Sequence, residues 1–341
     1  MSKKPLVSIV TACYNGEFFV WRCIEKVLEQ NYDNVEMIIV NDGSTDKTEE
    51  VVLSYEEKFK ERGYKLIYAK QENQGVGAAT NAALKYINGE YFALCDADNF
   101  YTTDYISEMV SFFQNNPKFS IVRCDGYKVY EKDVNTPFGK LARNHNEHHK
   151  ENLFENCLFF RNFHFGGAMF RTSDFDKINP TREIYPSRHG QNWQILLPML
   201  YCYKSGYLDK PLCYITYREN SVYNAVVRQN ASKQYEQKEE YYKLLEDTLN
   251  KIDMSSEERE DYLNKIKIFY AREKLIIAAK HNDVSVLEKE FKFLKENSTI
   301  TKSDKKWYRV GKSALLRTGI AFYAKTLNTL SKLKRKIVKG L

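Results

Sequence analysis

Short apolar runs rich in β-branched residues alternate with amphipathic stretches through the first hundred residues of the chain. The runs, bounded by turn residues, predict strands, and apolar positions three and four residues apart predict helices between them. A β-α-β-α-β-α-β order favours a parallel sheet covered by helices on both faces. The predicted strands are 6–12, 36–40, 65–69 and 91–95, and the predicted helices are 18–30, 47–60 and 75–87.

The pattern changes after residue 120. Residues 120–130 and 165–170 read as strands, the segment 131–150 is polar and loop-like, and 191–205 is an apolar helix despite Pro198. From about residue 232 the periodicity is almost entirely helical. We therefore predict a Rossmann-like α/β domain with a mostly parallel sheet, followed by a C-terminal α-helical region. The predicted boundaries are 1–220, 221–304 and 305–341.

Composition narrows the class of protein. The chain has 341 residues, 43% of them hydrophobic, and seven scattered cysteines without a CxxC pair. An odd number of cysteines within apolar runs is typical of reduced thiols in a cytoplasmic protein. No stretch of about 18 apolar residues predicts a membrane span. The first apolar run is broken by Ser8 and Thr11 and reads as a strand, not as a signal peptide.

The positive charge of the chain is concentrated at its C-terminus. The net charge is +7, yet eleven Lys or Arg and no Asp or Glu follow from Lys305 onward, which leaves +7 − 11 = −4 for residues 1–304. The segment 305–341 has the pattern of a basic amphipathic helix, which favours peripheral binding to the inner, anionic face of a cell membrane. The alternative is a helix packed on the protein with its lysines in solvent. Basicity confined to a tail disfavours a nucleic-acid partner.

Polar residues follow three predicted strands, in segments 11–15, 41–46 and 96–99. Parallel strands end at the same edge of a sheet, where ligands bind, so these segments are expected to converge. Asp96 and Asp98 emerge directly from the apolar run 91–95, and two carboxylates so close are costly to bury. Mn²⁺ or Mg²⁺ held with a diphosphate would relieve that cost. The alternative is a chance Asp-x-Asp in a surface loop.

Other residues near the same edge fit a nucleotide ligand. Asp42 follows the second strand, where an acceptor could contact a base or ribose. The segment 73–77, NQGVG, opens a helix whose N-terminal N–H groups could face a phosphate. The sequence has neither a Walker A nor a GxGxxG motif, which disfavours P-loop and dinucleotide-binding proteins.

The linked motifs NDGSTD (41–46), NQG (73–75) and DAD (96–98), within the stretches 7–48 and 73–99, resemble the family 2 glycosyltransferases. The resemblance is strong over about residues 5–130. It implies a GT-A fold, a nucleotide-diphosphate sugar donor, Mn²⁺ or Mg²⁺, inversion at the anomeric carbon and a role in bacterial surface polysaccharide synthesis. It also implies a metal site at Asp96 and Asp98. The implied donor-binding residues are Thr11, Ala12, Tyr14, Asn15, Asp42, Asn73, Gly75, Asp96, Ala97 and Asp98.

The chain departs from the family pattern at two places. Thr80 precedes Asn81 where many relatives have an arginine. Gln191-Asn192 stands where many relatives carry Glu-Asp, whose Asp is the general base. His189, whose unperturbed pKa suits a base, is an alternative, unless it is an ordinary surface histidine. The candidate catalytic residues are therefore Asp98, His189, Gln191 and Asn192.

Three functions remain open at this point. The first is an inverting glycosyltransferase using a UDP-sugar and a glycan or lipid-linked acceptor, with a possible homodimer through the C-terminal helices. The second is a catalytically degenerate scaffold on the membrane surface, which the missing Glu-Asp pair keeps open. The third is a sugar-phosphate nucleotidyltransferase, which the lack of a Gly-rich basic loop after the first strand disfavours. The histidine-rich segment 144–149 matches no standard zinc spacing and is not expected to bind metal.

Overall fold

The computed structural model describes residues 4–142, 153–159, 166–218 and 230–319. Contacts divide the chain into two units. The first comprises Met1–Ser221 with Lys243–Met254, and the second comprises Val222–Tyr242 with Ser255–Leu341. Within the described residues, no helix is long and apolar enough to cross a bilayer.

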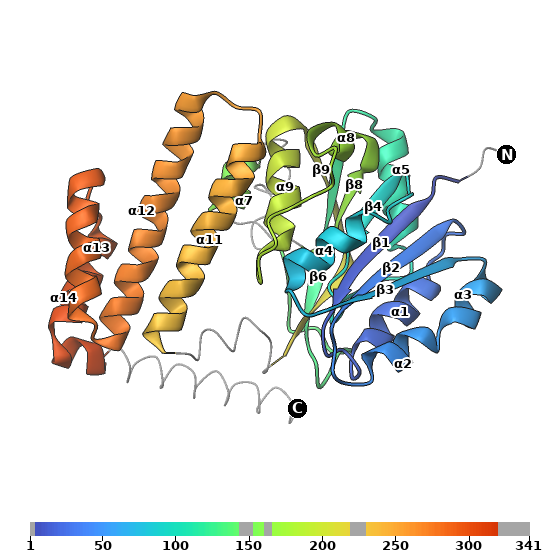
Figure 1. Cartoon of the computed structure of the whole chain (residues 1–341), viewed down its shortest axis with the longest axis horizontal. Helices are drawn as coiled ribbons and strands as arrows, with labels where there is room; N and C mark the ends of the chain where they lie inside the picture. The colour runs from blue at the N-terminus through green and yellow to red at the C-terminus, as the bar shows by residue number, and fades with distance from the viewer. Residues whose placement is uncertain (1–3, 143–152, 160–165, 219–229, 320–341) are drawn as a thin grey trace. The chain divides into compact units, whose positions relative to one another are not determined.

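The first unit is built on a nine-stranded sheet with the order β3-β2-β1-β4-β8-β6-β9-β5, with β7 paired to β6 (Figure 1). The strands β1, β2, β3 and β4 are mutually parallel, as predicted. Strand β8 runs antiparallel to both of its neighbours, while β6 and β9 are parallel to each other. The strands are β1 (Val7–Cys13), β2 (Val35–Asp42), β3 (Lys65–Gln71), β4 (Tyr91–Leu94), β5 (Phe100–Tyr101), β6 (Ile121–Tyr130), β7 (Gly139–Lys140), β8 (Ala168–Arg171) and β9 (Ser205–Tyr217).

Helices cover both faces of this sheet (Figure 1). Alternate strand residues such as Ile9, Met37 and Ala93 form a core with α1 and α5. On the other face α4 packs on β1 and β2, and the tilted rings of Phe92 and Phe175 in α8 have their centroids 5.2 Å apart. The helices are α1 (Val20–Leu28), α2 (Thr48–Leu53), α3 (Glu56–Arg62), α4 (Val76–Leu84), α5 (Tyr105–Asn115), α7 (Phe154–Leu158), α8 (Thr172–Ile178) and α9 (Gln191–Cys202).

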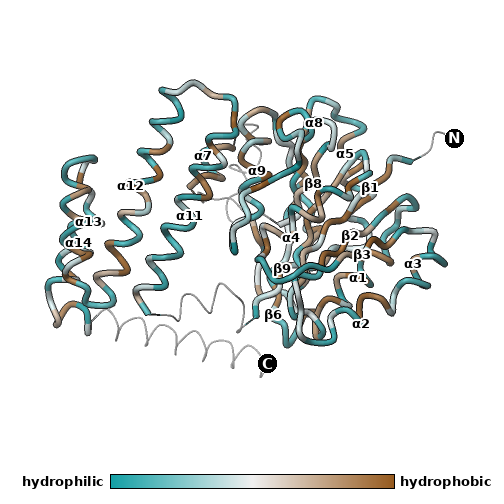
Figure 2. Tube along the Cα trace, in the orientation of Figure 1, coloured by the Kyte–Doolittle hydropathy of each residue, from teal (hydrophilic) through white to brown (hydrophobic). Residues whose placement is uncertain are grey.

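Burial follows the hydrophobic pattern closely. Every residue of β2 is buried, as expected for a central strand of a parallel sheet. Figure 2 shows hydrophobic residues concentrated along β1 and β2. All seven cysteines are free, and six are buried, as expected for reduced thiols, with Cys202 as the exposed exception.

Some predicted boundaries differ from those observed. The predicted helix 47–60 is two helices, α2 and α3, and the hydroxyl of Ser54 bonds to the carbonyl of Val51 at the break between them. This local bond competes with helix continuation. The predicted strand 165–170 begins only at Ala168, after Gly167, whose φ is +72°.

The second unit is helical. It contains the first part of α11 (Ala231–Lys251), together with α12 (Ser256–His281), α13 (Val284–Asn297) and α14 (Lys302–Lys312). Side chains cap three of these helices at their N-termini, and Thr301 with Asp304 forms a capping box. Val310, Trp307 and Tyr308 pack into the core of this unit, so the start of the basic C-terminal segment belongs to a folded helix. Residues 320–341 lie outside the described part.

Candidate active site

The loops that follow β1 and β2 are joined by hydrogen bonds. Asn15, at φ +49°, donates its N–H to Ser44 Oγ at 2.9 Å and accepts from the N–H of Thr45 at 2.9 Å. The N–H of Gly16 donates to Thr48 Oγ1 at 2.7 Å. Two of the three polar segments predicted to converge therefore form one rigid edge, close to the ends of their strands.

Asp42 is buried at the end of β2 and organises the segment before α4. Its carboxylate accepts from Gln71 Nε2 at 2.8 Å, the N–H of Gln74 at 3.0 Å and the N–H of Gly75 at 2.8 Å. Asn73 Nδ2 donates to the Asp42 carbonyl at 3.0 Å. The carboxylate is thus engaged within the protein, and its contact with a donor base stays a prediction.

The segment that leads into α9 lies against the first turn of α4. The N–H of Gly77 donates to the carbonyl of Ser187 at 2.9 Å. The side chain of Asn81 makes two bonds to the backbone of Ile184, donating to its carbonyl at 2.8 Å and accepting from its N–H at 2.7 Å. Sequence reasoning noted Asn81 only beside Thr80 and missed this role, because a contact across 103 positions leaves no local signal.

Asp96 is held by two neutral amides. Gln191 Nε2, in the first residue of α9, donates to Asp96 Oδ1 at 3.1 Å, and Asn99 Nδ2 donates to Oδ2 at 3.1 Å. Burial, together with the nearby charge of Asp98, raises the pKa of Asp96 to about 6. The structure therefore brings together Asp96 and Gln191, which the sequence analysis assigned to metal binding and catalysis.

Asp98 is held by a cation. Arg218 Nε donates to Asp98 Oδ2 at 2.9 Å, and the two side chains are 21% and 20% exposed, respectively. Burial raises the pKa of Asp98, and the ion pair with Arg218 opposes that shift. The guanidinium carbon of Arg218 lies 4.1 Å from the ring centroid of Phe19. Arg218 was not among the predicted site residues, since nothing near it in the sequence indicates a partner 120 positions away.

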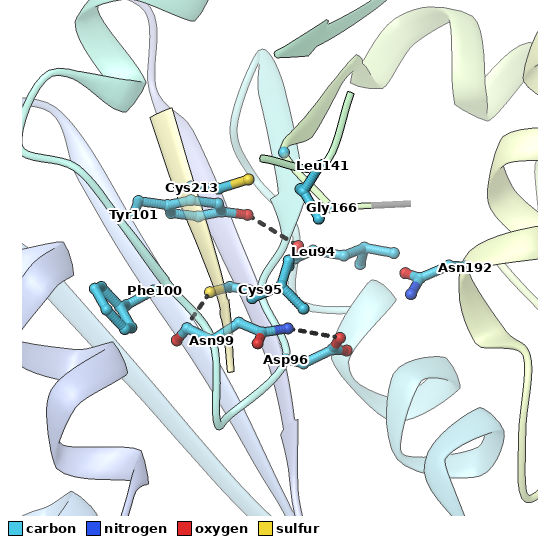
Figure 3. A pocket seen from close by; sticks show the side chains of 12 residues that line it. Leu94, Cys95, Asp96, Asn99, Phe100, Tyr101, Leu141, Gly166, Asn192 and Cys213 are labelled. Carbon is cyan, nitrogen blue, oxygen red and sulfur yellow. Dashed lines mark hydrogen bonds between the residues drawn. The ribbon is translucent and has the colours of Figure 1, made fainter. Parts of the chain in front are cut away.

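A cavity of about 310 Å³ opens beside Asp96 (Figure 3). Asp96, from the loop after β4, and Asn192, from α9, both line it. Its volume is at the lower end of the range of small-molecule sites, about 300–1,000 Å³. The other lining residues are Leu94, Cys95, Asn99, Phe100, Tyr101, Leu141, Gly166, Gly167, Cys213 and Ile215.

The remaining predicted residues lie at the same edge or in the adjoining core. Thr11 is buried in β1 with its hydroxyl 4.0 Å from Cys23 Sγ, whereas Tyr14 is 50% exposed. Ala12 is half-buried and Ala97 is buried. The carbonyl of His189 accepts from Ser187 Oγ. Trp193 of α9 is buried and donates to the Cys157 carbonyl at 3.1 Å.

The paired carboxylates fit a divalent cation shared with a diphosphate. Their oxygens are the ligands that Mn²⁺ and Mg²⁺ prefer, and Asp98 raises the pKa of Asp96, a repulsion that a bound cation would relieve. Within the described residues, no group of three His, Cys, Asp or Glu side chains is placed to hold a metal alone. Segment 144–149 lies outside those residues.

The fold defines an α/β protein with a mostly parallel sheet, and the paired carboxylates after β4 lie at the edge where such sheets bind ligands. The chain belongs to glycosyl transferase family 2, whose family model matches residues 8–178, half of its length. Its fold is GT-A. It resembles Staphylococcus aureus TarS 1-349, solved in complex with UDP, with 15% identity, 90% coverage of both chains and a TM-score of 0.58. It also resembles the mannosyltransferase PcManGT from Pyrobaculum calidifontis, solved with GDP-Man and Mn²⁺, with 14% identity, coverage of 95% and 89%, and a TM-score of 0.54.

Two curated relatives share the N-terminal part. An uncharacterized glycosyltransferase of Rickettsia typhi is 36% identical over 128 residues, 38% of each chain. The glycosyltransferase GlyA of Streptococcus pneumoniae is 32% identical over 103 residues, 30% of this chain and 14% of its own. The chain thus spans well under half the length of these two relatives.

Proposed function

We propose that this protein is an inverting glycosyltransferase that moves a sugar from a nucleotide-diphosphate donor, a UDP-sugar, to a glycan or lipid-linked acceptor in surface polysaccharide synthesis. The observation that carries the proposal is the pair Asp96 and Asp98 in the loop after β4, with Asp96 in the lining of a cavity of about 310 Å³. Within family 2, that arrangement is best explained by a donor diphosphate at the carboxylates and a sugar in the cavity.

Asp96 and Asp98 would hold Mn²⁺ or Mg²⁺, which when bound neutralises charge on the departing diphosphate. The protein's own contribution is orientation. The hydrogen bonds between the β1 and β2 loops fix the edge that would receive the nucleotide. The bonds that Asp42 makes to Gln74 and Gly75 fix the segment before α4. A rigid site of this kind loses little entropy when the donor binds.

The acceptor hydroxyl would attack from the face opposite the diphosphate, and its proton needs a base. Asn192 lines the cavity but cannot accept a proton at neutral pH. His189 precedes Gln191 by two residues, and Gln191 is bonded to Asp96. We therefore propose that His189 is the general base that accepts this proton. Gln191 would hold Asp96, and Asn192 would orient the acceptor.

The experiment is a panel of UDP- and GDP-sugars, screened by thermal shift with and without Mn²⁺. The two nucleotides are chosen because the similar structures contain UDP and GDP-Man. A donor present at about 100 times its Kd adds about 2.7 kcal/mol to the stability of the folded state. We expect a metal-dependent rise in Tm with one donor, and its absence in Asp98→Asn. The matched control is Asp33→Asn, at an exposed carboxylate that is 67% accessible.

A turnover assay distinguishes an active enzyme from a scaffold. Donor hydrolysis or transfer is measured through the nucleotide that is released. Gln191-Asn192 in place of Glu-Asp is the observation that favours a scaffold. Metal-dependent donor binding without any turnover in the presence of a panel of oligosaccharide acceptors would support it. Absence of binding by every UDP- and GDP-sugar, with or without Mn²⁺, would contradict the proposed transferase and also favour the scaffold.

The same proposal places the protein at the inner face of a membrane through the basic segment 305–341. Because α14 packs into the helical unit, a truncation after Gly319 should leave this helix folded. Flotation with vesicles containing phosphatidylglycerol should carry the full chain but not a chain ending at Gly319. Equal flotation of both, or flotation with phosphatidylcholine alone, would contradict an electrostatic membrane contact. Light scattering during gel filtration tests the proposed homodimer.

A further inference from the structure

The two carboxylates at the end of β4 have partners of different charge. Asp96 accepts from the neutral amides of Gln191 and Asn99. Asp98 accepts instead from the guanidinium of Arg218, with 2.9 Å between Nε and Oδ2. The donor of that bond follows β9, which ends at Tyr217 and pairs with both β6 and β5. The partner of Asp98 is thus supplied by the second half of the sheet.

This ion pair is protected from solvent. Only about a fifth of each side chain is accessible, with 21% for Arg218 and 20% for Asp98. The face of the Phe19 ring lies 4.1 Å from the guanidinium carbon and shields it further. An ion pair in such a position is screened less by water and salt than a surface pair, and its charge-assisted hydrogen bond is strong.

A divalent cation and the Arg218 guanidinium would compete for Asp98. Coordination of Mn²⁺ or Mg²⁺ needs a free carboxylate oxygen, while the guanidinium both occupies Oδ2 and repels a second cation. A diphosphate changes this balance because it supplies negative charge at the same edge. The planar guanidinium fork matches phosphate oxygens as well as it matches a carboxylate.

We propose that Arg218 is the internal counter-ion of Asp98, which competes with the divalent cation and is transferred to the diphosphate when the donor binds. The inference rests on the proposed function. Its consequence is an order of binding: the metal binds weakly alone and tightly together with the nucleotide. Arg218 is in this sense a positioning residue that makes the metal site dependent on the donor.

A second arginine offers a charge-matched control. Arg22 of α1 also interacts electrostatically with Asp98, and burial lowers its pKa. Its guanidinium carbon lies 5.3 Å from the ring of Trp21 and 5.7 Å from that of Phe100. Its Nε and Nη1 have no hydrogen-bond partner in the described part of the chain. Arg22 therefore resembles Arg218 in charge and aromatic contacts but is not bonded to Asp98 through these atoms.

The experiment measures Mn²⁺ binding to the full chain by electron paramagnetic resonance, without nucleotide, in wild type, Arg218→Met and Arg22→Met. Methionine retains an apolar stem against Phe19 and removes every donor. Loss of a competing ion pair worth about 1.4 kcal/mol should tighten Mn²⁺ binding about tenfold in Arg218→Met. Arg22→Met should change it less than about threefold, the effect of a charge that acts only through space. Adding Asp98→Asn to Arg218→Met should abolish the gain.

The second arm measures UDP and GDP binding in the presence of saturating Mn²⁺ by calorimetry. Here Arg218→Met should lower the affinity for the nucleotide that wild type binds by about tenfold, because the phosphate loses a charged hydrogen bond. Opposite signs in the two arms distinguish the proposal from structural damage, which would weaken both. Circular dichroism and Tm establish that the variants are folded.

Unchanged or weaker Mn²⁺ binding by folded Arg218→Met would overturn the inference, as would an equal gain in Arg22→Met. Unchanged nucleotide affinity would overturn the transfer of Arg218 to the diphosphate. Failure of wild type to bind either nucleotide with Mn²⁺ would instead contradict the proposed function. The first arm, which needs no nucleotide, would still decide whether Arg218 competes with metal for Asp98.

Discussion

Gly77 is the position where a single methyl group should disturb the site most clearly. It is the second residue of α4, and its N–H bonds to the Ser187 carbonyl at 2.9 Å. A Cβ at this position would lie 2.7 Å from the N of Ser187, 2.8 Å from its O and 2.8 Å from the O of Tyr185. All three are backbone atoms, so no side-chain rotation can relieve the contact.

Two effects of Gly77→Ala oppose each other. Alanine favours a helix over glycine by about 1 kcal/mol. Overpacking against backbone costs about 1–3 kcal/mol, and strain on the bond to Ser187 costs about 1 kcal/mol more. The clash should win, with a net loss of about 2 kcal/mol, or about 4–8 °C in Tm for a domain of this size. Because residues 185–190 lead directly into α9, the Gln191–Asp96 bond should loosen and donor turnover should fall.

Two assays are needed. Urea unfolding is monitored by circular dichroism, and donor turnover is measured by the nucleotide-release assay proposed above. The matched control is Gly139→Ala in β7, where an added Cβ has no neighbour within 4 Å. That variant should stay within about 0.5 kcal/mol of wild type. If Gly77→Ala were as stable and as active as Gly139→Ala, the close packing of α4 on residues 185–187 would be refuted.

Four further predictions follow from individual contacts. Asp42→Asn should lower stability by about 2 kcal/mol, since an amide nitrogen must then face an N–H donor. The exposed control Asp33→Asn should leave the urea midpoint nearly unchanged, and equal midpoints for the two variants would contradict this. Asn81→Leu should cost about 2 kcal/mol by leaving the Ile184 N–H and carbonyl unpaired, and a urea midpoint equal to that of wild type would contradict this. The pKa of Asp96 is raised from 3.8 to about 6 in the metal-free folded state. Between these pH values the folded state holds a proton that the unfolded chain has released, so the stability due to this proton is lost as the pH rises. In EDTA, the free energy of unfolding of wild type should therefore fall by about 2–3 kcal/mol relative to that of Asp96→Asn as the pH rises from 4 to 7. A difference between the two proteins that does not change with pH would count against the raised pKa. Because His189 is the proposed base, Asn192→Asp should leave the rate of donor turnover nearly unchanged, and faster turnover at neutral pH would contradict that role of His189.

The parallel half of the sheet could be predicted because its signals are local. Each strand from β1 to β4 is a short apolar run, and a parallel arrangement places their ends together. That reasoning located Asp96, Asp98 and Asp42 at one edge without any structural information. The split between α2 and α3 was missed because it depends on one hydroxyl, that of Ser54, bonding back to the backbone.

The pairing of these residues could not be predicted, because their partners come from distant parts of the chain, although the family resemblance had placed Gln191 in the site. Gln191 lies 95 positions from Asp96, and Arg218 lies 120 positions from Asp98. Each pair depends on how α9 and β9 return to the edge formed by β4. A carboxylate at a strand end indicates a site, but the sequence does not say whether its partner is a ligand, an amide or a cation.

The glutamine at position 191 makes physical sense in the light of these contacts. Its amide nitrogen is 3.1 Å from Asp96 Oδ1, where it donates a hydrogen bond. A glutamate in the same place would bring a third carboxylate to within hydrogen-bonding distance of Asp96, whose pKa is already raised by burial and by Asp98. The amide instead stabilises the ionised form of Asp96, which is the form that a metal needs. Gln191 is therefore compatible with the proposed metal site, while Asn192 places an amide where the family resemblance implies a carboxylate base.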